Sequence, residues 1–137
     1  PIHHAAGYGH ISVLQYLRKC GAEVHAETDQ SHTPFFVSVL NGHVHAAEFF
    51  LEQRADVSAM VGIKPRWAPI HAAAARGSIP LLDLLLQHGA DLSMESASGK
   101  RPLEFCINKR ARKYLETILS NGNAPRGENT TDKVDEL

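Results

Sequence analysis

The sequence of 137 residues predicts an all-α fold, a solenoid of stacked helix-turn-helix units. The first observation is a repeat that opens with proline, and its four copies start at Pro1, Pro34, Pro69 and Pro102. A second series runs in phase with these prolines and consists of Gly21-Ala22-Glu23-Val24, Arg54-Ala55-Asp56-Val57 and Gly89-Ala90-Asp91-Leu92. A helical repeat of this length indicates units that cannot bury their apolar face alone and therefore stack.

Each unit is expected to open with a short helix that starts at its proline. Proline suits the first helical turn because its missing N–H would have no partner there, and Thr33 before Pro34 is a good N-cap. Small residues follow, as in Ala72-Ala73-Ala74, and would let neighbouring units approach closely. The helix should end at a glycine with a left-handed backbone, and these turn glycines are Gly9, Gly42 and Gly77.

The second helix of each unit is expected to be bulkier than the first. Its apolar residues recur at helical spacing and would share one face; they include Val13, Leu14 and Leu17 in the first unit and Leu81, Leu82 and Leu85 in the third. Gly21 and Gly89 are expected to end two of these helices as C′ residues. In the fourth unit the helix expected over Arg112–Leu119 is polar on one side, which suits a terminal unit without a further neighbour.

The motifs Pro-Ile-His-His-Ala-Ala, Gly-His and Gly-Ala-Asp resemble those of ankyrin repeats at that family's spacing. The resemblance covers about residues 1–122 in four units, approximately 1–27, 28–59, 60–94 and 95–122, which are named units 1 to 4 below. It implies an ankyrin-repeat solenoid in which β-turn loops, called fingers, protrude between the helix pairs. It also implies that the solenoid binds another protein or peptide and has no catalytic residues. His3 and His71 occupy the motif position whose side chain, in the family, ties the turn to the helix by a hydrogen bond.

Several positions depart from the repeated motif. In unit 2, Phe36 replaces the motif histidine, Ser31 the finger glycine and Arg54 the glycine that ends the second helix. Unit 3 carries two extra residues within Met60–Ala68. In unit 4, Arg110-Ala111 stand where units 1 and 2 have Gly-His, so the register predicts the turn there. Unit 1 lacks a finger, and it is therefore either truncated or preceded by a further repeat.

The composition argues against several classes of function. No apolar run approaches the ~20 residues that a membrane span needs, and no basic segment leads into an apolar stretch as in a signal peptide. The net charge is −1, so nucleic-acid binding is not expected. Cys20 and Cys106 are expected to be reduced thiols of an intracellular protein, most simply a cytoplasmic one, with the nucleus not excluded.

The nine histidines do not form a pattern of metal ligands. They are spread over different units, and His43 and His45, two residues apart, would point to different faces of a helix. No nucleophile with a histidine and an acid, no pair of carboxylates and no glycine-rich phosphate loop can be recognised. We therefore expect no metal site, no cofactor and no enzymatic activity.

The resemblance implies that a partner binds on the concave side, at the finger tips and at the two residues before each turn glycine. The candidate residues by register are Tyr8, Asp29, Gln30, His32, Asn41, Ile63, Lys64, Arg66, Trp67, Arg76, Lys100, Arg101 and Lys109. Lysine and arginine predominate in units 3 and 4, which favours an acidic or phosphorylated partner segment. The alternative is a solvated face whose charges keep the solenoid soluble.

The third finger, Met60–Trp67, is longer and more apolar than the others. Trp, Met and Arg are enriched at binding hot spots, so Trp67 is a candidate anchor for a partner. Alternatively, Trp67 and Ile63 fold back over the neighbouring finger and fill a gap. Both interpretations remain open at the level of sequence.

The last segment, 123–137, is rich in Asn, Asp, Glu and Thr and is expected to be a disordered acidic tail. The leading hypothesis for the function is a protein–protein interaction module. The second hypothesis is that these repeats regulate or target a larger enzyme or channel. The sequence gives neither the partner nor the oligomeric state.

Overall fold

The computed structural model describes residues 1–62 and 66–121, so Ile63, Lys64 and the expected tail lie outside the described residues. The described part of the chain contains eight α-helices, with bounds α1 Ile2–Tyr8, α2 Ile11–Lys19, α3 Pro34–Leu40, α4 Val44–Glu52, α5 Pro69–Arg76, α6 Ile79–Gln87, α7 Pro102–Phe105 and α8 Lys109–Ser120. None of these eight helices is both long and apolar enough to cross a membrane.

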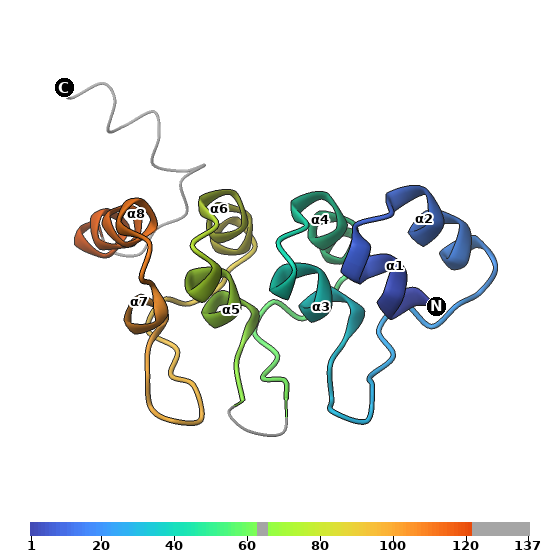
Figure 1. Cartoon of the computed structure of the whole chain (residues 1–137), viewed down its shortest axis with the longest axis horizontal. Helices are drawn as coiled ribbons and strands as arrows, with labels where there is room; N and C mark the ends of the chain where they lie inside the picture. Colours follow the sequence, from blue (N-terminus) through green and yellow to red (C-terminus); the bar gives the residue numbers. More distant parts are fainter. Residues whose placement is uncertain (63–65, 122–137) are drawn as a thin grey trace.

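The helices form four antiparallel pairs that stack side by side in one row (Figure 1). The second helices α2, α4, α6 and α8 make one layer, and the first helices α1, α3, α5 and α7 make the layer below it. The loops that precede α3, α5 and α7 protrude from the first-helix layer as fingers. This arrangement confirms the all-α solenoid of helix-turn-helix units.

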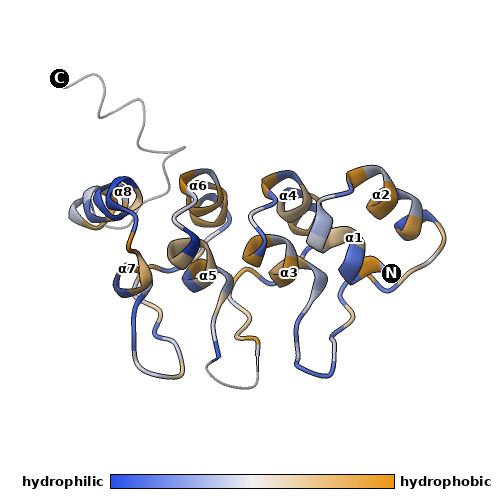
Figure 2. Ribbon diagram, viewed as in Figure 1, coloured by the Kyte–Doolittle hydropathy of each residue, from blue (hydrophilic) through white to orange (hydrophobic). Residues whose placement is uncertain are grey.

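The core lies between neighbouring helix pairs. Each second helix contributes at least one side chain with no exposed surface: Leu14 in α2, Phe50 in α4, Leu85 in α6 and Leu115 in α8. Hydrophobic residues are carried mainly by the helices, and the fingers before α3 and α7 are mostly hydrophilic (Figure 2). Burial of such a side chain stabilises the fold by roughly 1.5–3 kcal/mol, and the neighbouring unit supplies much of the covering surface.

The first helices begin at their prolines with different caps. The Thr33 hydroxyl accepts a hydrogen bond from the Phe36 N–H at 3.1 Å, which confirms the predicted N-cap of α3. Ala68 precedes Pro69 and has no capping side chain, so His71 does this work instead: its Nδ1 accepts the Ala68 N–H at 3.0 Å. A capping bond of this kind contributes about 1 kcal/mol.

Within residues 1–62 and 66–121, two residues other than glycine adopt a left-handed backbone, and both replace a motif glycine. Ser31 has φ 62° at the tip of the second finger, and Arg54 has φ 68° just after α4. The corresponding residue after α6, Gly89, has φ 95°. A side chain in this region costs about 1–2 kcal/mol, so Arg54 and Ser31 are points of strain in unit 2.

The histidines of units 1 and 3 tie each unit to the next. His3 Nε2 donates to the carbonyls of Ala26 and His32, at 2.8 and 3.1 Å, at the base of the second finger. His71 Nε2 donates to the Met94 carbonyl at 2.9 Å, at the base of the fourth finger. Unit 2 has Phe36 at this position, so the third finger lacks the corresponding tie.

The turn between the two helices of unit 4 lies earlier in the sequence than the register predicted. The sequence placed it at Arg110-Ala111, but α7 ends at Phe105 and α8 already begins at Lys109. The reason is Asn108, whose Oδ1 accepts the Ala111 N–H at 3.0 Å and caps α8 almost one turn early. The second helix is therefore longer than the predicted Arg112–Leu119, and Lys109 belongs to α8 rather than to the end of the first helix.

The two cysteines have opposite environments. Cys20 is exposed after α2, whereas Cys106 is buried between α7 and α8, and neither forms a disulfide. Burial raises the pKa of the Cys106 thiol above its usual value. Cys106 is therefore the less reactive thiol in the folded protein.

Candidate functional site

The fingers and the first-helix layer enclose an apolar hollow between units 2 and 3. Its volume is about 200 Å³. We call it the finger groove; its lining residues are His32, Phe36, Leu40, Val61, Gly62 and Trp67. The imidazole of His32 lies against the ring of Phe36, with centroids 5.4 Å apart. The hollow thus offers an aromatic wall on one finger and a second aromatic wall, Trp67, on the next.

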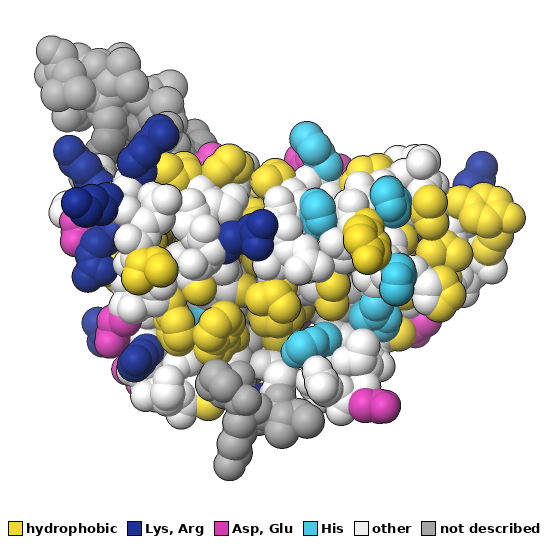
Figure 3. Space-filling view, viewed as in Figure 1, with side chains coloured by type: hydrophobic (Ala, Val, Ile, Leu, Met, Phe, Trp, Pro, Cys, Tyr) yellow, Lys and Arg dark blue, Asp and Glu magenta, His cyan; other side chains and the backbone are white. Residues whose placement is uncertain are grey.

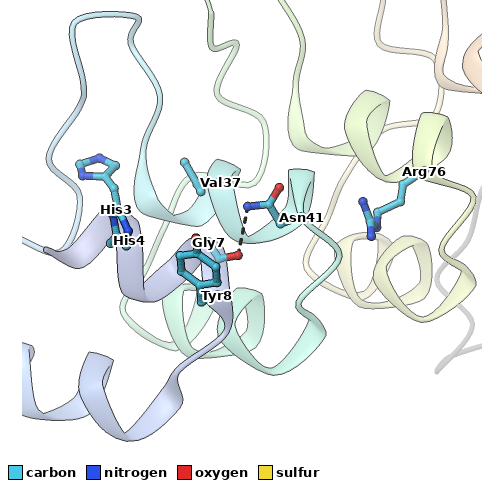
Figure 4. A pocket seen from close by; sticks show the side chains of 7 residues that line it. All are labelled: His3, His4, Gly7, Tyr8, Val37, Asn41 and Arg76. Atoms are coloured by element: carbon cyan, nitrogen blue, oxygen red, sulfur yellow. Dashed lines mark hydrogen bonds between the residues drawn. The ribbon is translucent and has the colours of Figure 1, made fainter.

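A second, wider hollow of about 560 Å³ lies along the ends of the first helices. We call it the helix groove; it is lined by His3, His4, Gly7, Tyr8, Val37, Asn41 and Arg76 (Figure 4). Tyr8 is exposed, and its ring lies between those of His4 and His10, with centroids 5.3 and 5.9 Å away. This hollow is polar and aromatic, in contrast to the apolar finger groove.

Two predicted contact residues already bond to the preceding unit. Asn41 Nδ2 donates to the Gly7 carbonyl at 3.1 Å, the bond drawn in Figure 4. Arg76 Nη1 donates to the Leu40 carbonyl at 3.1 Å. Each bond satisfies a carbonyl at the end of a first helix that has no intrahelical partner. These side chains therefore hold the stack together as well as lining the groove.

Trp67 packs into the solenoid and also lines the finger groove. Its indole meets the ring of Phe105 edge-on, with centroids 4.9 Å apart, so it lies against α7 of unit 4, whereas the gap-filling interpretation expected it over the neighbouring finger. Its Nε1 is buried and has no hydrogen-bond partner among the described residues. A buried N–H without an acceptor costs about 1–3 kcal/mol.

A pair of backbone hydrogen bonds joins the two sides of the third finger at its base. Val61 N–H donates to Trp67 O at 2.8 Å, and Trp67 N–H donates to Val61 O at 3.0 Å. The second and fourth fingers close with one such bond each, Thr28 to His32 O and Ser96 to Lys100 O. Five residues separate the bonded pair in the third finger and three in the others, so the two extra residues of unit 3 lie between Val61 and Trp67.

Arg66 braces the third finger against its neighbours. Its Nη2 donates to the Met60 carbonyl at 2.9 Å, across the base of the finger. The Arg66 carbonyl accepts the Ala97 N–H at 3.1 Å and so joins the third finger to the fourth. Arg66 is exposed as a residue although it makes these bonds.

Charge is distributed unevenly along the solenoid. Lysine and arginine side chains gather over α7 and α8, whereas histidines spread over units 1 and 2 (Figure 3). Lys100 and Arg101 are exposed on the fourth finger and at the start of α7. Asp29 and Gln30 are exposed at the tip of the second finger. Lys109 is exposed as well, but on α8 and outside both grooves.

The register did not point to every lining residue of the finger groove. Phe36, Val61 and Gly62 were not among the predicted contacts. Phe36 could have been found, because an aromatic residue in place of the motif histidine adds apolar surface beside the finger. Leu40 is one of the two residues before the turn glycine Gly42, where the register expected the contact surface, and 38% of its surface is exposed although it is apolar.

The described residues contain no cluster of three or more histidine, cysteine, aspartate or glutamate side chains that could hold a metal ion. Burial lowers the pKa of His71 below its usual value. Its hydrogen bonds to Ala68 N–H and Met94 O fit a neutral ring with the proton on Nε2. His71 therefore has a structural role at neutral pH.

Comparison with known protein families matches two stretches of the chain. Residues 1–61 match the description "Ankyrin repeats (3 copies)", and residues 66–96 match "Ankyrin repeat". Together the two stretches include the helix pairs from α1 to α6.

Individual proteins similar to the chain include two ankyrin repeat and SOCS box proteins. The chain is 30% identical over 111 residues to "Ankyrin repeat and SOCS box protein 11" of Mus musculus, covering 80% of this chain and 33% of that protein. It is 32% identical over 105 residues to "Ankyrin repeat and SOCS box protein 9" of the same species, covering 77% and 35%. It is also 34% identical over 92 residues to "ADP-ribosylation factor GTPase-activating protein AGD4" of Arabidopsis thaliana, covering 61% and 12%. The chain thus spans about one third of the length of the first two relatives.

Proposed function

The chain belongs to the ankyrin-repeat family, whose repeats are protein-binding modules, and we propose that it holds a peptide segment of a partner protein in the finger groove. The observation that carries this proposal is an apolar hollow between two aromatic side chains on adjacent fingers. Such a hollow is typical of the pockets that receive an anchor residue at protein interfaces. In this proposal the repeats act by binding, without catalysis and without a cofactor.

The groove favours an extended segment with an apolar anchor. His32 and Trp67 flank the hollow, and the exposed Leu40 contributes to its wall. Basic groups follow on the side of units 3 and 4, where Arg66 and Ala97 join two fingers and Lys100 is exposed. An acidic or phosphorylated residue beside the anchor would therefore gain charge-assisted hydrogen bonds.

Selection of binders from a random peptide display library tests this proposal directly. We expect enriched peptides to carry an apolar residue next to Asp or Glu, and phosphorylated versions to bind more tightly. Trp67 is the chain's only tryptophan, so its emission should shift when a peptide enters the groove. Selected peptides that leave the emission unchanged would place the binding surface elsewhere.

Substitutions separate the apolar and the charged contributions. Leu40→Asp should lower the affinity for the selected peptides at least tenfold, because it puts a charge into the apolar wall. Lys100→Glu with Arg101→Glu should lower this affinity severalfold and reduce the salt dependence of binding. The matched control is Arg18→Glu with Lys19→Glu, which makes the same charge change on exposed residues of α2 and should leave affinity unchanged.

A second candidate function is that these repeats regulate or target a larger protein. The observation that favours it is the small share of each relative that the chain covers, 12% in the GTPase-activating protein. The exposed and unpaired thiol of Cys20 suits an intracellular location, which we also propose. Mass spectrometry of the endogenous protein tests this candidate: a mass close to 15.0 kDa would contradict it.

A further inference from the structure

We propose that the outer side of unit 1 is the seat of one more helix-turn-helix repeat, which packs on α1 and α2 as unit 1 packs on α3 and α4. We call this side the N-terminal face; its central residues are Tyr8, Val13 and Tyr16. It is separate from the finger groove, so the inference does not depend on the proposed function. The occupant is a repeat joined to Pro1 through a finger, as Pro34 and Pro69 are each preceded by one.

Register shows which residues of unit 1 lack a covering neighbour. With a shift of 33 residues, the distance from Pro1 to Pro34, the equivalent of Val13 in unit 2 is Ala46 and the equivalent of Tyr16 is Phe49. Ala46 is completely buried and Phe49 has 6% of its surface exposed. Val13 and Tyr16 have 43% and 64% exposed. The same helical positions are thus closed in unit 2, where unit 1 precedes, and open in unit 1.

Unit 3 repeats the pattern of unit 2 at the first of these two positions. The next shift, of 35 residues from Pro34 to Pro69, makes Leu81 the counterpart of Ala46, and Leu81 is also completely buried, whereas Leu84, the counterpart of Phe49, is half-buried. In unit 4 the counterpart of Val13 is Tyr114, which is half-buried against unit 3. A position that is covered in all three units with a preceding repeat, and occupied by exposed valine in unit 1, indicates an interface that continues in the same direction. Exposed hydrophobic side chains gather over α2 at this end of the molecule (Figure 3).

The polar residues of the N-terminal face correspond to residues that bond across the other interfaces. His43 Nε2 donates to the Gly7 carbonyl of the preceding unit at 2.8 Å, and its counterpart in unit 1 is His10. Tyr8 is the counterpart of Asn41, which donates to the same Gly7 carbonyl. His10 and Tyr8 therefore present a hydrogen-bond donor each at the place where a preceding helix would end.

The N-terminal face is also hollowed. A depression of about 400 Å³ lies on it, lined by Pro1, His4, Ala5, Tyr8, His10 and Val13. In the inner interfaces, the following unit places a side chain over each turn glycine: His43 over Gly9 and Arg76 over Gly42. Stacking of a preceding repeat would set His10 over that repeat's turn glycine in the same way.

A second copy of this chain fits the N-terminal face less well. Head-to-tail stacking would bring the outer side of α8 onto it. That helix exposes four basic side chains, Lys109, Arg110, Arg112 and Lys113, together with Glu116. Burying these charges against Val13 and Tyr16 would cost desolvation energy without a compensating partner. The two ends of the solenoid are therefore not complementary, which favours a repeat of the same polypeptide over a second molecule.

An extended chain tests the proposal. A copy of residues 1–33 fused before Pro1 supplies a repeat whose following face already packs on unit 2 in this protein. We expect the urea midpoint of unfolding to rise by about 1 M or more, because one further interface is formed. Protection of the α2 amides of the original unit 1 from hydrogen exchange should rise as well.

The matched control is Val13→Glu with Tyr16→Glu in the original unit 1. Both side chains are exposed, so these substitutions should leave the midpoint of the 137-residue chain unchanged. In the extended chain they should cancel the gain and the added protection. Equal midpoints of the extended chain with and without the two glutamates would overturn the proposal. So would sedimentation showing that the 137-residue chain dimerises and that these glutamates dissociate it, because a second copy would then be the occupant.

Discussion

The two ends of the solenoid differ in how they meet the solvent. At the end formed by unit 4, charged residues cover α8 and short polar contacts hold it in place. Tyr114 donates to Asp83 Oδ1 at 2.9 Å, and Arg112 Nη1 donates to the Cys106 carbonyl at 3.3 Å. At the end formed by unit 1, valine and tyrosine face the solvent. The outer side of unit 4 is thus largely charged, whereas that of unit 1 is largely apolar and aromatic.

The largest expected loss of stability comes from substitutions in the core. They test whether the two ends of the solenoid differ only at their surfaces. Leu14→Ala and Leu115→Ala each remove a completely buried side chain, one from each end. We expect each to lower the free energy of unfolding by about 3 kcal/mol, because both leave a cavity. Urea denaturation measures the two values. A cost below about 1 kcal/mol for Leu14→Ala would show that unit 1 is not packed like unit 4, which would extend the difference to the core.

The next effect concerns the histidine that ties unit 3 to the charged end. His71→Phe introduces the residue that unit 2 has at Phe36, and it leaves the Ala68 N–H and the Met94 carbonyl without their partner. We expect a loss of about 2 kcal/mol. The matched control is His45→Phe on the exposed surface of α4, which should change stability by less than about 0.5 kcal/mol.

The same substitution should change the response to pH. Burial lowers the pKa of His71, so the folded state favours the neutral ring. The stability that this provides is fully present above the unfolded pKa of about 6.5 and is lost as the pH falls through that value toward the lower folded one. Thermal unfolding between pH 7.5 and 5.5 should therefore show a weaker pH dependence for His71→Phe than for the unchanged chain. An identical dependence would mean that His71 does not titrate differently in the two states.

A smaller effect compares the caps of the two terminal second helices. Asn108→Ala removes a side-chain cap from α8 and should cost about 1 kcal/mol. His10 precedes α2 without a capping bond from its side chain, so His10→Ala should cost only a few tenths of a kcal/mol. Chemical denaturation of the two variants distinguishes these values. Equal losses would contradict the account of Asn108 as the residue that starts α8 early.

The smallest effect is expected at the exposed ion pair of α8. Arg112 Nε lies 3.7 Å from Glu116 Oε2, and both side chains are about half exposed. Glu116→Gln should therefore lower stability by less than about 0.5 kcal/mol. Arg112→Gln should cost more, since it also removes the bond to the Cys106 carbonyl. A larger effect of Glu116→Gln would show that the charged end depends on its ion pair rather than on the bonds to the backbone.

The repeat predicted the fold because each unit carries the same local signals. Proline at the start of the first helix, small residues within it and glycine at its end recur in register, and the structure follows them in units 1 to 3. The register failed in unit 4, where the cap at Asn108 replaces the absent turn glycine. A local competition between two possible helix starts is not decided by the spacing of the repeat.

The candidate site was less predictable than the fold because it depends on contacts between units. Arg76 bonds to a carbonyl 36 residues earlier, and Trp67 packs on Phe105 from the following unit. Spacing along one repeat does not indicate such contacts. The contacts of the third finger therefore emerge only when the units are seen side by side, and the interpretation of Trp67 as an anchor for a partner stays a prediction.

The contrasting environments of Cys20 and Cys106 place a chemical reporter near each end of the chain. A thiol reagent will modify Cys20 at the rate of a free cysteine, but it reaches Cys106 only when α7 and α8 separate. Labelling kinetics therefore measure how often the charged end opens while the rest stays folded. With no foreign probe attached, the native protein can thus report whether its last repeat detaches before global unfolding.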